Sequence, residues 1–340
     1  MHICKSKPEG RNMMKLVFVG DVMLGRLVND YLQEAPLEYP WGDTLGIFQD
    51  ADFRFCNLEC VISDKGEPWT RTPKVFHFRS DAKNIETLKA AKIDTVSLAN
   101  NHVLDYSKEA LADMLRILRK NKILYAGAGE GLAEAKRPAI INKAGSGIEL
   151  FAVTDNEPDW QAGIDRPGTF YLPMDIRDKM AQVFLEDIKE EETRGGLIAV
   201  SLHWGGNWGY EPPRKHIDFA HALVDTGADI VLGTSPHVFR GIEIYKRKPI
   251  FYSLGDFIDV YAVDDLEPND ESFIFEVEIE GDNVKRIILR TVIVSNFQAN
   301  LAAGSRKEGI MAKMVALSRR LGTRLEKKKD SLGLSKEIFR

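Results

Sequence analysis

The chain has 340 residues, of which 44% are hydrophobic, so it can bury a substantial core in one large α/β domain or two smaller ones. Its net charge of -5 argues against a general nucleic-acid binder, which would carry a basic surface. Three cysteines are too few for a disulfide framework. Cys56 and Cys60 are therefore interpreted as small buried thiols in preference to a zinc site.

The first residues, 1–14, carry charges but lack the apolar stretch of a signal peptide. We expect them to form a disordered leader before the first strand. No apolar run in the sequence is long enough to cross a bilayer. The sequence therefore predicts a cytoplasmic protein without a membrane anchor, and it leaves the oligomeric state open.

Short apolar runs alternate with amphipathic segments along the chain. Strands are predicted at 16–19, 53–56, 93–98, 123–126, 148–153, 197–202, 230–232 and 250–254. Helices are predicted at 82–91, 108–120, 178–192 and 213–226. Two longer runs, 273–279 and 284–294, predict a β-hairpin, and residues 301–340 have the composition of a charged helical tail. This alternation favours a layered α/β architecture.

Polar side chains with metal-binding chemistry follow most of the predicted strands. They are Asp21, Glu59, Asn101, His102, His203, His237 and Asp256. The carboxyl ends of strands form the sites of open α/β sheets, so these side chains are expected to meet. Carboxylates, amides and imidazoles bind Mn²⁺, Fe²⁺ or Zn²⁺, and ligands from several strands can hold one or two such ions. Any one of these residues also has a purely structural interpretation, but their recurrence at matching strand ends favours a metal centre.

Several segments occur in the order found in a known family. They are GDVMLGR (20–26), NLE (57–59), FHFRSD (76–81), SLANNHVLDYS (97–107), GAG (127–129), HWG (203–205), GADIVLGTSPHVFRGIE (227–243) and FYSLGDFI (251–258). This set resembles the CapA/PgsA family of poly-γ-glutamate capsule synthesis proteins, within the metallophosphoesterase-like superfamily. The resemblance implies a four-layer α/β/β/α sandwich of the metallo-dependent phosphatase type, placed at 15–300, with a di-metal centre between two sheets.

The resemblance also implies a role for individual residues. Asp21 resembles the carboxylate of the first metal, and Glu59 resembles the acid that bridges both metals. His237 resembles a further ligand of the first metal. Asn101 and His203 resemble ligands of the second metal.

Beside the metal ligands, His102 resembles the non-ligand histidine that protonates the leaving group. Asp105 is placed either to orient His102 or to cap the following helix. The chain departs from the superfamily where Met23 and Ser235 replace histidines, which leaves one or two bound metals as alternatives. Asp256 replaces an asparagine of the family and is expected to add a negative ligand or to cap a turn.

Substrate contacts are expected from three further residues. His77 and Arg79 lie in the matched segment FHFRSD, and Trp204 begins an aromatic run, WGGNWGY, that forms either a wall beside the site or core. Trp69, Arg71 and Lys74 lie in a Pro-containing loop that could line a cleft and hold an anion, but an exposed irregular loop is the favoured interpretation.

Two hypotheses about function follow. The first is a metal-dependent hydrolase or transferase that acts on a phosphoester or on an amide-linked polymer such as poly-γ-glutamate, using a metal-activated water. The second is a non-catalytic component of capsule or polyglutamate biosynthesis with a degenerate metal site. The partner in the first case is a small-molecule or polymer substrate.

Overall fold

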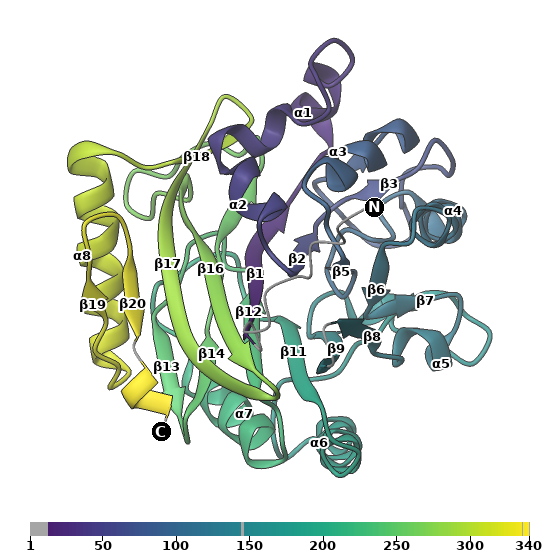
Figure 1. Cartoon of the computed structure of the whole chain (residues 1–340). Helices are drawn as coiled ribbons and strands as arrows, with labels where there is room; N and C mark the ends of the chain where they lie inside the picture. Colours follow the sequence, from purple (N-terminus) through teal and green to yellow (C-terminus); the bar gives the residue numbers. More distant parts are fainter. Residues whose placement is uncertain (1–12, 144–145, 335, 340) are drawn as a thin grey trace, which may run out of the picture.

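The computed structural model describes residues 13–143, 146–334 and 336–339. Two large β-sheets lie face to face, and helices cover the outer side of each sheet (Figure 1). The predicted four-layer α/β/β/α architecture is confirmed. Of the expected leader, Met13 and Met14 already belong to the first strand, and residues 1–12 lie outside the described part of the chain.

The first sheet has ten strands, and its strand ends carry Asp21 and Asp256 and lead to Glu59, Asn101 and His102. Its order is β19 (Glu326–Lys327), β20 (Leu332–Leu334), β17 (Asn283–Ser295), β16 (Glu271–Glu280), β1 (Met13–Val22), β2 (Phe53–Leu58), β5 (Thr95–Ser97) and β6 (Leu124–Ala126), with β15 (Asp256–Ile258) beside β1 and β18 (Gln298–Leu301) beside β17. The strands β1, β2, β5 and β6 run parallel, so their carboxyl ends share one edge.

The second sheet has six strands and carries the rest of the site. Its order is β13 (Ile242–Tyr245), β14 (Lys248–Phe251), β12 (Ile230–Thr234), β11 (Leu197–His203), β9 (Ser146–Thr154) and β8 (Ala139–Lys143). The four central strands are parallel, and the two edge strands are antiparallel to them. Two further sheets have two strands each. One pairs β3 (Val61–Ile62) with β4 (Arg79–Ser80), and the other pairs β7 (Ala128–Gly129) with β10 (Gly168–Thr169).

Alternation along the strands explains the layers. In β1, Leu16 packs in the layer between the sheets, whereas its neighbour Val17 packs on the outer face. In β9, Leu150 enters the same shared layer and Phe151 packs beneath the helices of the other side. Both sheets are thus apolar on both faces, which is what a sheet with two covered faces requires.

The helices are short and amphipathic. Their bounds are α1 (Arg26–Tyr31), α2 (Leu45–Gln49), α3 (Ile85–Ala90), α4 (Ser107–Lys120), α5 (Leu132–Ala135), α6 (Lys179–Glu192), α7 (Arg214–Asp225) and α8 (Gly304–Arg320), with 3₁₀ turns η1 (Tyr39–Thr44), η2 (Ala82–Asn84), η3 (Pro158–Trp160) and η4 (Lys336–Phe339). On α4 the predicted face is confirmed, because Leu111, Leu115 and Leu118 are fully buried against the first sheet. Burial of each such leucine stabilises the fold by roughly 1.5–3 kcal/mol.

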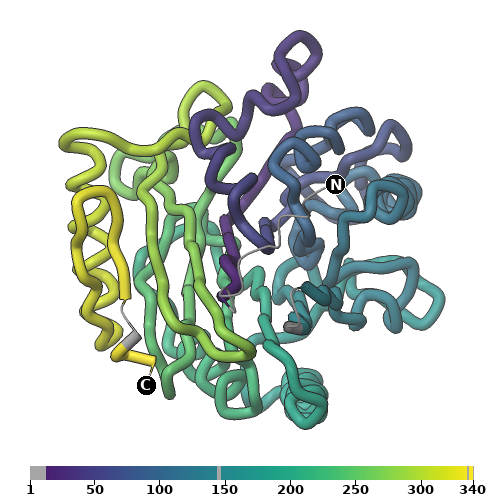
Figure 2. The backbone as a smooth tube through the Cα atoms, in the orientation of Figure 1, coloured from purple at the N-terminus to yellow at the C-terminus, as the bar shows by residue number. Residues whose placement is uncertain are grey.

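The C-terminal segment differs from the expected helical tail. Among the described residues of this segment α8 is the only α-helix, and the chain then returns as β20, which pairs with β17 (Figure 2). The apolar side of α8, including Met311 and Met314, packs into the layer between the two sheets. The segment 301–340 therefore closes one edge of the sandwich, and its charges lie on the outer side of the helix.

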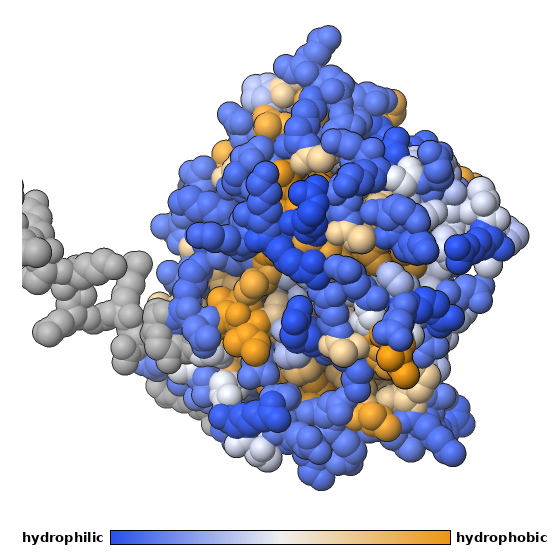
Figure 3. All heavy atoms as spheres, turned by 90° about the vertical axis from the view of Figure 1, so that its right-hand side faces the viewer, coloured by the Kyte–Doolittle hydropathy of each residue, from blue (hydrophilic) through white to orange (hydrophobic). Residues whose placement is uncertain are grey.

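The surface gives little further guidance to function. Figure 3 shows that the side facing right in Figure 1 is mostly hydrophilic, with small apolar patches between polar side chains. Among the described residues, no helix combines the length and the apolar character needed to cross a membrane.

Candidate metal centre

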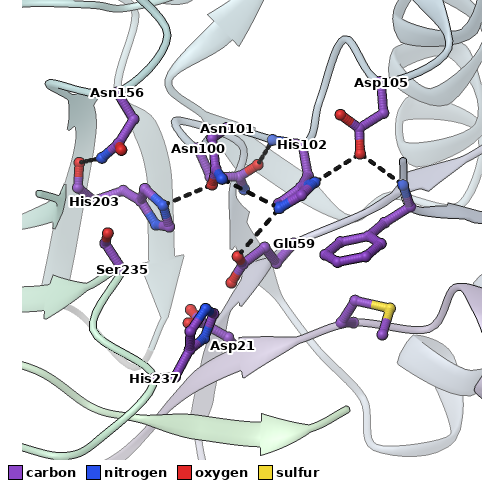
Figure 4. A network of polar contacts seen from close by, with 12 residues as sticks. Asp21, Glu59, Asn100, Asn101, His102, Asp105, Asn156, His203, Ser235 and His237 are labelled. Carbon is purple, nitrogen blue, oxygen red and sulfur yellow. Dashed lines mark hydrogen bonds and ion pairs between the residues drawn. The ribbon is translucent and has the colours of Figure 1, made fainter. Parts of the chain in front are cut away.

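The candidate site lies where the carboxyl ends of both sets of parallel strands meet. Asp21 lies near the end of β1, Glu59 follows β2, and Asn101 and His102 follow β5 (Figure 4). From the second sheet, His203 ends β11, and His237 lies in the loop after β12. The strand-end rule therefore brings together side chains separated by more than half of the sequence.

Two sets of possible metal ligands share one residue. Ligand atoms of Asp21, His237 and Asp256 lie within 4.8 Å of one another, and so do those of Asp21, Glu59 and His203. Asp21 is common to both sets because β1 lies between β2 and β15, with Asp21 in register with Asn57 and Asp256. Glu59 was expected to bridge the metals, but the geometry gives the shared position to Asp21.

Asn101 adjoins the second set. Its Oδ1 is 2.9 Å from His203 Nε2, and His203 Nδ1 is 3.1 Å from Thr234 Oγ1. On the other side of the site, His237 Nδ1 is 2.9 Å from Asp256 Oδ1. Asp256 can therefore ligate a cation itself or hold the His237 ring as a ligand, a common use of a carboxylate beside a metal-binding imidazole.

The site concentrates negative charge away from water. Asp21, Glu59, Asp256 and Asp259 are all buried. Burial raises the pKa of Glu59 well above its usual range, and the neighbouring charge of Asp21 adds to the effect. The pKa of Asp256 is raised by burial and then by Asp21, and that of Asp259 by burial and then by Asp256. Such a cluster is costly unless protons or cations neutralise it.

The donor set fits a divalent cation. One carboxylate oxygen, Asp21 Oδ2, is buried and has no hydrogen-bond partner within the described residues. Asn57 Nδ2 donates to the other oxygen, Oδ1, at 2.8 Å and so fixes the orientation of the carboxylate. The pKa of His203 and that of His237 are both lowered by burial, which keeps the rings neutral as metal ligands require. Buried carboxylates and neutral imidazoles are the ligands of Mn²⁺, Fe²⁺ and Zn²⁺.

His102 and Asp105 form a buried pair beside the metal ligands. His102 Nδ1 is 2.6 Å from Asp105 Oδ2, and the backbone N–H of Phe78 donates to the same oxygen at 2.6 Å. The Phe78 ring stacks on the imidazole with centroids 4.0 Å apart. Of the two roles open to Asp105, the structure shows contact with His102, whereas no side chain caps α4.

Burial shifts the pKa of both residues of this pair toward the neutral form. Burial raises the pKa of Asp105 to about 7, an effect that the charge of Lys74 opposes. Burial, and then Lys74, lowers the pKa of His102 well below its usual range. The Nε2 atom of His102 lies 3.2 Å from Asn101 Nδ2 and 3.7 Å from Glu59 Oε1, so it faces the metal ligands.

Lys74 is a buried cation that the sequence did not reveal. Its side chain is 7% exposed, and the favoured interpretation of an exposed loop is wrong for this residue. The ammonium donates to Asn101 O at 2.6 Å and to Glu157 Oε1 at 3.1 Å, and it lies 3.5 Å from Asp105 Oδ1. Lys74 thus links the loop after β5 with the loop after β9 of the other sheet.

A cavity of about 690 Å³ opens onto this group. Among its lining residues are Asn101, His102 and His237 of the candidate site, together with Arg26, Lys74, Phe76, Phe78, Glu157, Asn207, Trp208, Tyr261 and Asn269. This volume is typical of a small-molecule site, and its wall mixes aromatic rings with a few charged groups.

The residues expected to contact substrate lie elsewhere. His77 and Arg79 line an adjoining depression of about 180 Å³, which shares Arg26 with the cavity, and Arg79 stacks on Tyr106 there. Trp204 is fully buried, donates through Nε1 to Tyr252 O at 3.1 Å and packs in the outer core beneath α7. Trp204 therefore cannot form the wall of the cavity, and Trp208 takes that place. Ser235 lies near His203 in Figure 4, and its Oγ donates to Gly205 O at 3.1 Å.

The chain is similar to several known proteins. The protein 'Probable polyglutamine synthesis accessory protein' of Mycobacterium tuberculosis (strain CDC 1551 / Oshkosh) is 30% identical over 343 residues, which cover 96% of this chain and 89% of that relative. The 'PGA biosynthesis protein CapA' of Bacillus subtilis (strain 168) is 29% identical over 75% of this chain and 65% of its own length.

Solved structures support the fold. A 5'-nucleotidase precursor from Thermus thermophilus superimposes with a TM-score of 0.50 at 11% identity, over 92% of this chain and 60% of that chain. At this identity the likeness concerns the fold alone. The family described as 'Bacterial capsule synthesis protein PGA_cap' matches residues 15–261, the part that carries every candidate ligand. The chain belongs to this PGA_cap family.

Proposed function

We propose that this protein is a metal-dependent hydrolase that cleaves a phosphoester bond. The observation that carries the proposal is the meeting of two ligand sets, which share Asp21, with the His102–Asp105 pair at one cavity. A purely structural acidic cluster would have no need of a neutral imidazole held by a carboxylate at its edge. The two groups together have the composition of a hydrolytic site.

Metal binding would use residues from both sheets. Asp21, His237 and Asp256 would hold one cation, and Asp21, Glu59 and His203 would hold a second, with Asn101 beside His203. A bound divalent cation supplies Lewis acidity and lowers the pKa of water. Both sets use the Asp21 carboxylate, so the affinity for either cation depends on this residue.

His102 handles the proton in this proposal. Asp105 Oδ2 lies against Nδ1 and fixes the plane of the ring, so Nε2 is the atom that faces a leaving oxygen. When the pair holds two protons, one on Nε2 and one between Nδ1 and Asp105, the ring gives the Nε2 proton to the leaving oxygen and keeps the other on Nδ1. Phe78 stacks on one face of the ring and restricts its rotation. The pair shares its protons, because the pKa of Asp105 is raised to about 7 while that of His102 is lowered.

The relatives suggest where such an activity belongs. Their names connect them with polyglutamine synthesis and with the biosynthesis of PGA, so a role in making or trimming a capsule polymer is the biological setting that we propose. An amide-linked polymer such as poly-γ-glutamate is then the second substrate class. The alternative of a non-catalytic component draws on Ser235, which takes a place where the superfamily has a histidine ligand.

Metal analysis combined with a phosphatase assay tests the proposal. The full chain is stripped with a chelator, reloaded with Mn²⁺, Fe²⁺ or Zn²⁺, and assayed with p-nitrophenyl phosphate and with poly-γ-glutamate. We expect stoichiometric metal and metal-dependent turnover of the phosphoester. Asp282→Asn, in the β16–β17 turn at the opposite end of β1 from Asp21, is the control for Asp21→Asn. Metal without turnover of either substrate would favour the non-catalytic alternative.

A further inference from the structure

Arg26 occupies an unusual position at the mouth of the cavity. It follows Gly25 and begins α1, and its backbone φ of 50° lies in the left-handed region that residues with a side chain rarely adopt. Gly25 permits the turn, because a Cβ atom there would lie 3.0 Å from both N and O of Arg79. Strain of this kind persists where the surrounding structure imposes it, often at functional sites.

The guanidinium of Arg26 contacts two aromatic rings of the cavity wall. Its Cζ is 5.4 Å from the ring centroid of Phe76 and 5.9 Å from that of Phe78. The Phe78 ring in turn stacks on His102 at 4.0 Å. Phe78 therefore connects Arg26 with the imidazole, and a substrate group that points away from His102 toward the cavity mouth would meet Arg26.

The charge of Arg26 is available to a ligand. Of the two cations that line the cavity, Lys74 is already surrounded by three protein oxygens. Within residues 13–143, 146–334 and 336–339, Arg26 makes contacts with aromatic rings but no ion pair. Asp30 and Asp81 line the adjoining depression, and Asp81 Oδ2 accepts a hydrogen bond from Gln33 Nε2 at 2.8 Å. Neither carboxylate pairs with Arg26.

We infer that Arg26 is a specificity residue that binds an acidic group on the leaving-group portion of the substrate. The group is a carboxylate or a phosphate-like group, because the planar guanidinium binds both through paired hydrogen bonds. This inference rests on the proposed function, which places the leaving oxygen at His102. The metal ligands require only the phosphoester that is cleaved. Arg26 adds the requirement that the leaving group of the substrate carries a second negative charge.

Matched substrates separate this role from general catalysis. 4-Carboxyphenyl phosphate and 4-carbamoylphenyl phosphate differ in the charge of the leaving group, and 4-phosphonophenyl phosphate tests the phosphate-like alternative. The readout is the kcat/KM of each acidic substrate relative to the carbamoyl substrate. Arg26→Met should lower this ratio about two- to fivefold, mainly through KM, as expected for one partly exposed charge pair. Arg26→Lys should restore part of it.

Arg71→Met is the matched control. Arg71 also lies 5.4 Å from an aromatic ring, that of Trp69, but it does not line the cavity, so its loss should leave the ratio unchanged. An unchanged ratio in Arg26→Met, or an equal fall in Arg71→Met, would overturn the inference. If the metal-loaded protein turns over none of the three esters, the proposed function fails. Calorimetric titration with the same esters then still tests Arg26, and equal affinity in wild type and Arg26→Met counts against it.

Discussion

His102 Nδ1 lies 2.6 Å from Asp105 Oδ2, and this contact fixes which ring nitrogen faces the metal ligands. Because Nδ1 contacts Asp105, the other ring nitrogen, Nε2, faces Asn101 and Glu59. The sequence places Asn101 and His102 side by side, but the structure gives them different partners. Asn101 contacts His203 of the other sheet, whereas His102 turns toward Asp105 of its own loop.

His102→Ala should therefore separate chemistry from metal binding. We expect turnover to fall by about 10²–10⁴-fold, the usual contribution of a general acid. Metal content should stay near that of wild type, because neither ligand set includes His102. Elemental analysis and steady-state kinetics on the same preparation provide the measurement. His221→Ala, on α7, is the control, and loss of metal in His102→Ala would mean that His102 is itself a ligand.

Asp21 should matter more for metal binding than any other carboxylate of the site. Asp21→Asn removes a charged ligand from both sets, so we expect it to abolish binding of both cations. Asp256→Asn and Glu59→Gln each alter one set and should lower the stoichiometry by no more than one ion. Inductively coupled plasma mass spectrometry after equilibrium dialysis gives the numbers. If Glu59→Gln loses both ions while Asp21→Asn retains one, Glu59 is the bridging residue after all.

Lys74 should be required both for activity and for the position of the loops around the cavity. Lys74→Met leaves Asp105 and Glu157 without their shared cation. Asp105, whose pKa is already raised to about 7, can then take up a proton, so the expected loss of stability is that of hydrogen bonds to charged groups, about 1.5–3 kcal/mol. We expect a lower unfolding temperature and a lower kcat, with partial recovery in Lys74→Arg. Differential scanning calorimetry and kinetics test both effects. Wild-type kcat in Lys74→Met would show that Asp105 does not depend on this cation.

The layered α/β architecture and the polar side chains at the strand ends were predictable from local patterns, whereas the four-layer arrangement was expected only from the family resemblance. Strands such as β1 and β11 are mostly apolar, and each carries a residue of the site at or next to its last position, Asp21 or His203. The end of a strand can be recognised in the sequence even when its partners cannot. The structure showed where these ends meet, since that depends on how the two sheets pack.

The residues expected to contact substrate and the residues that line the cavity alternate along one segment. Side chains of an extended segment alternate between two sides, so Phe76 and Phe78 line the cavity while His77 and Arg79 face the adjoining depression. The same alternation sends Trp204 into the core although its neighbour His203 lies in the site. A motif identifies such a segment, but only the packing tells which side faces the cavity.

Lys74 could not be predicted for a different reason. Its burial depends on oxygens of Asn101, Asp105 and Glu157, which belong to loops distant in the sequence. The Pro-containing segment around it has the composition of an exposed loop, and Val75 and Phe76 are indeed exposed. A local pattern cannot reveal a cation whose partners come from two different sheets.

His216 should make the stability of the protein depend on pH. The ring is fully buried on α7, stacks on Trp204 with centroids 4.4 Å apart, and has no hydrogen-bond partner for either nitrogen within the described residues. Burial, and then the charge of Arg240, lowers its pKa from 6.5 to about 3. Between these two values the unfolded chain binds a proton at His216 and the folded chain does not.

The sign of the effect follows from this difference in bound protons. The free energy of unfolding must fall as the pH drops through 6.5, and the loss continues until the folded protein itself takes up the proton near pH 3. From pH 7 to pH 5, His216 alone accounts for a loss of about 2 kcal/mol. His216→Phe, which keeps a ring against Trp204, and His216→Leu, which does not, should both remove this part of the pH dependence.

Urea unfolding of wild type and both variants at several pH values between 5 and 7 measures the effect. The absolute stabilities of the two variants will differ, because phenylalanine and leucine fill the space beside Trp204 differently. Their loss of stability on acidification should nevertheless be the same, and smaller than that of wild type by the amount attributed to His216. Other buried histidines contribute equally to all three proteins and cancel in the comparison. Parallel curves for wild type and both variants would show that His216 is protonated in the fold as readily as in the unfolded chain.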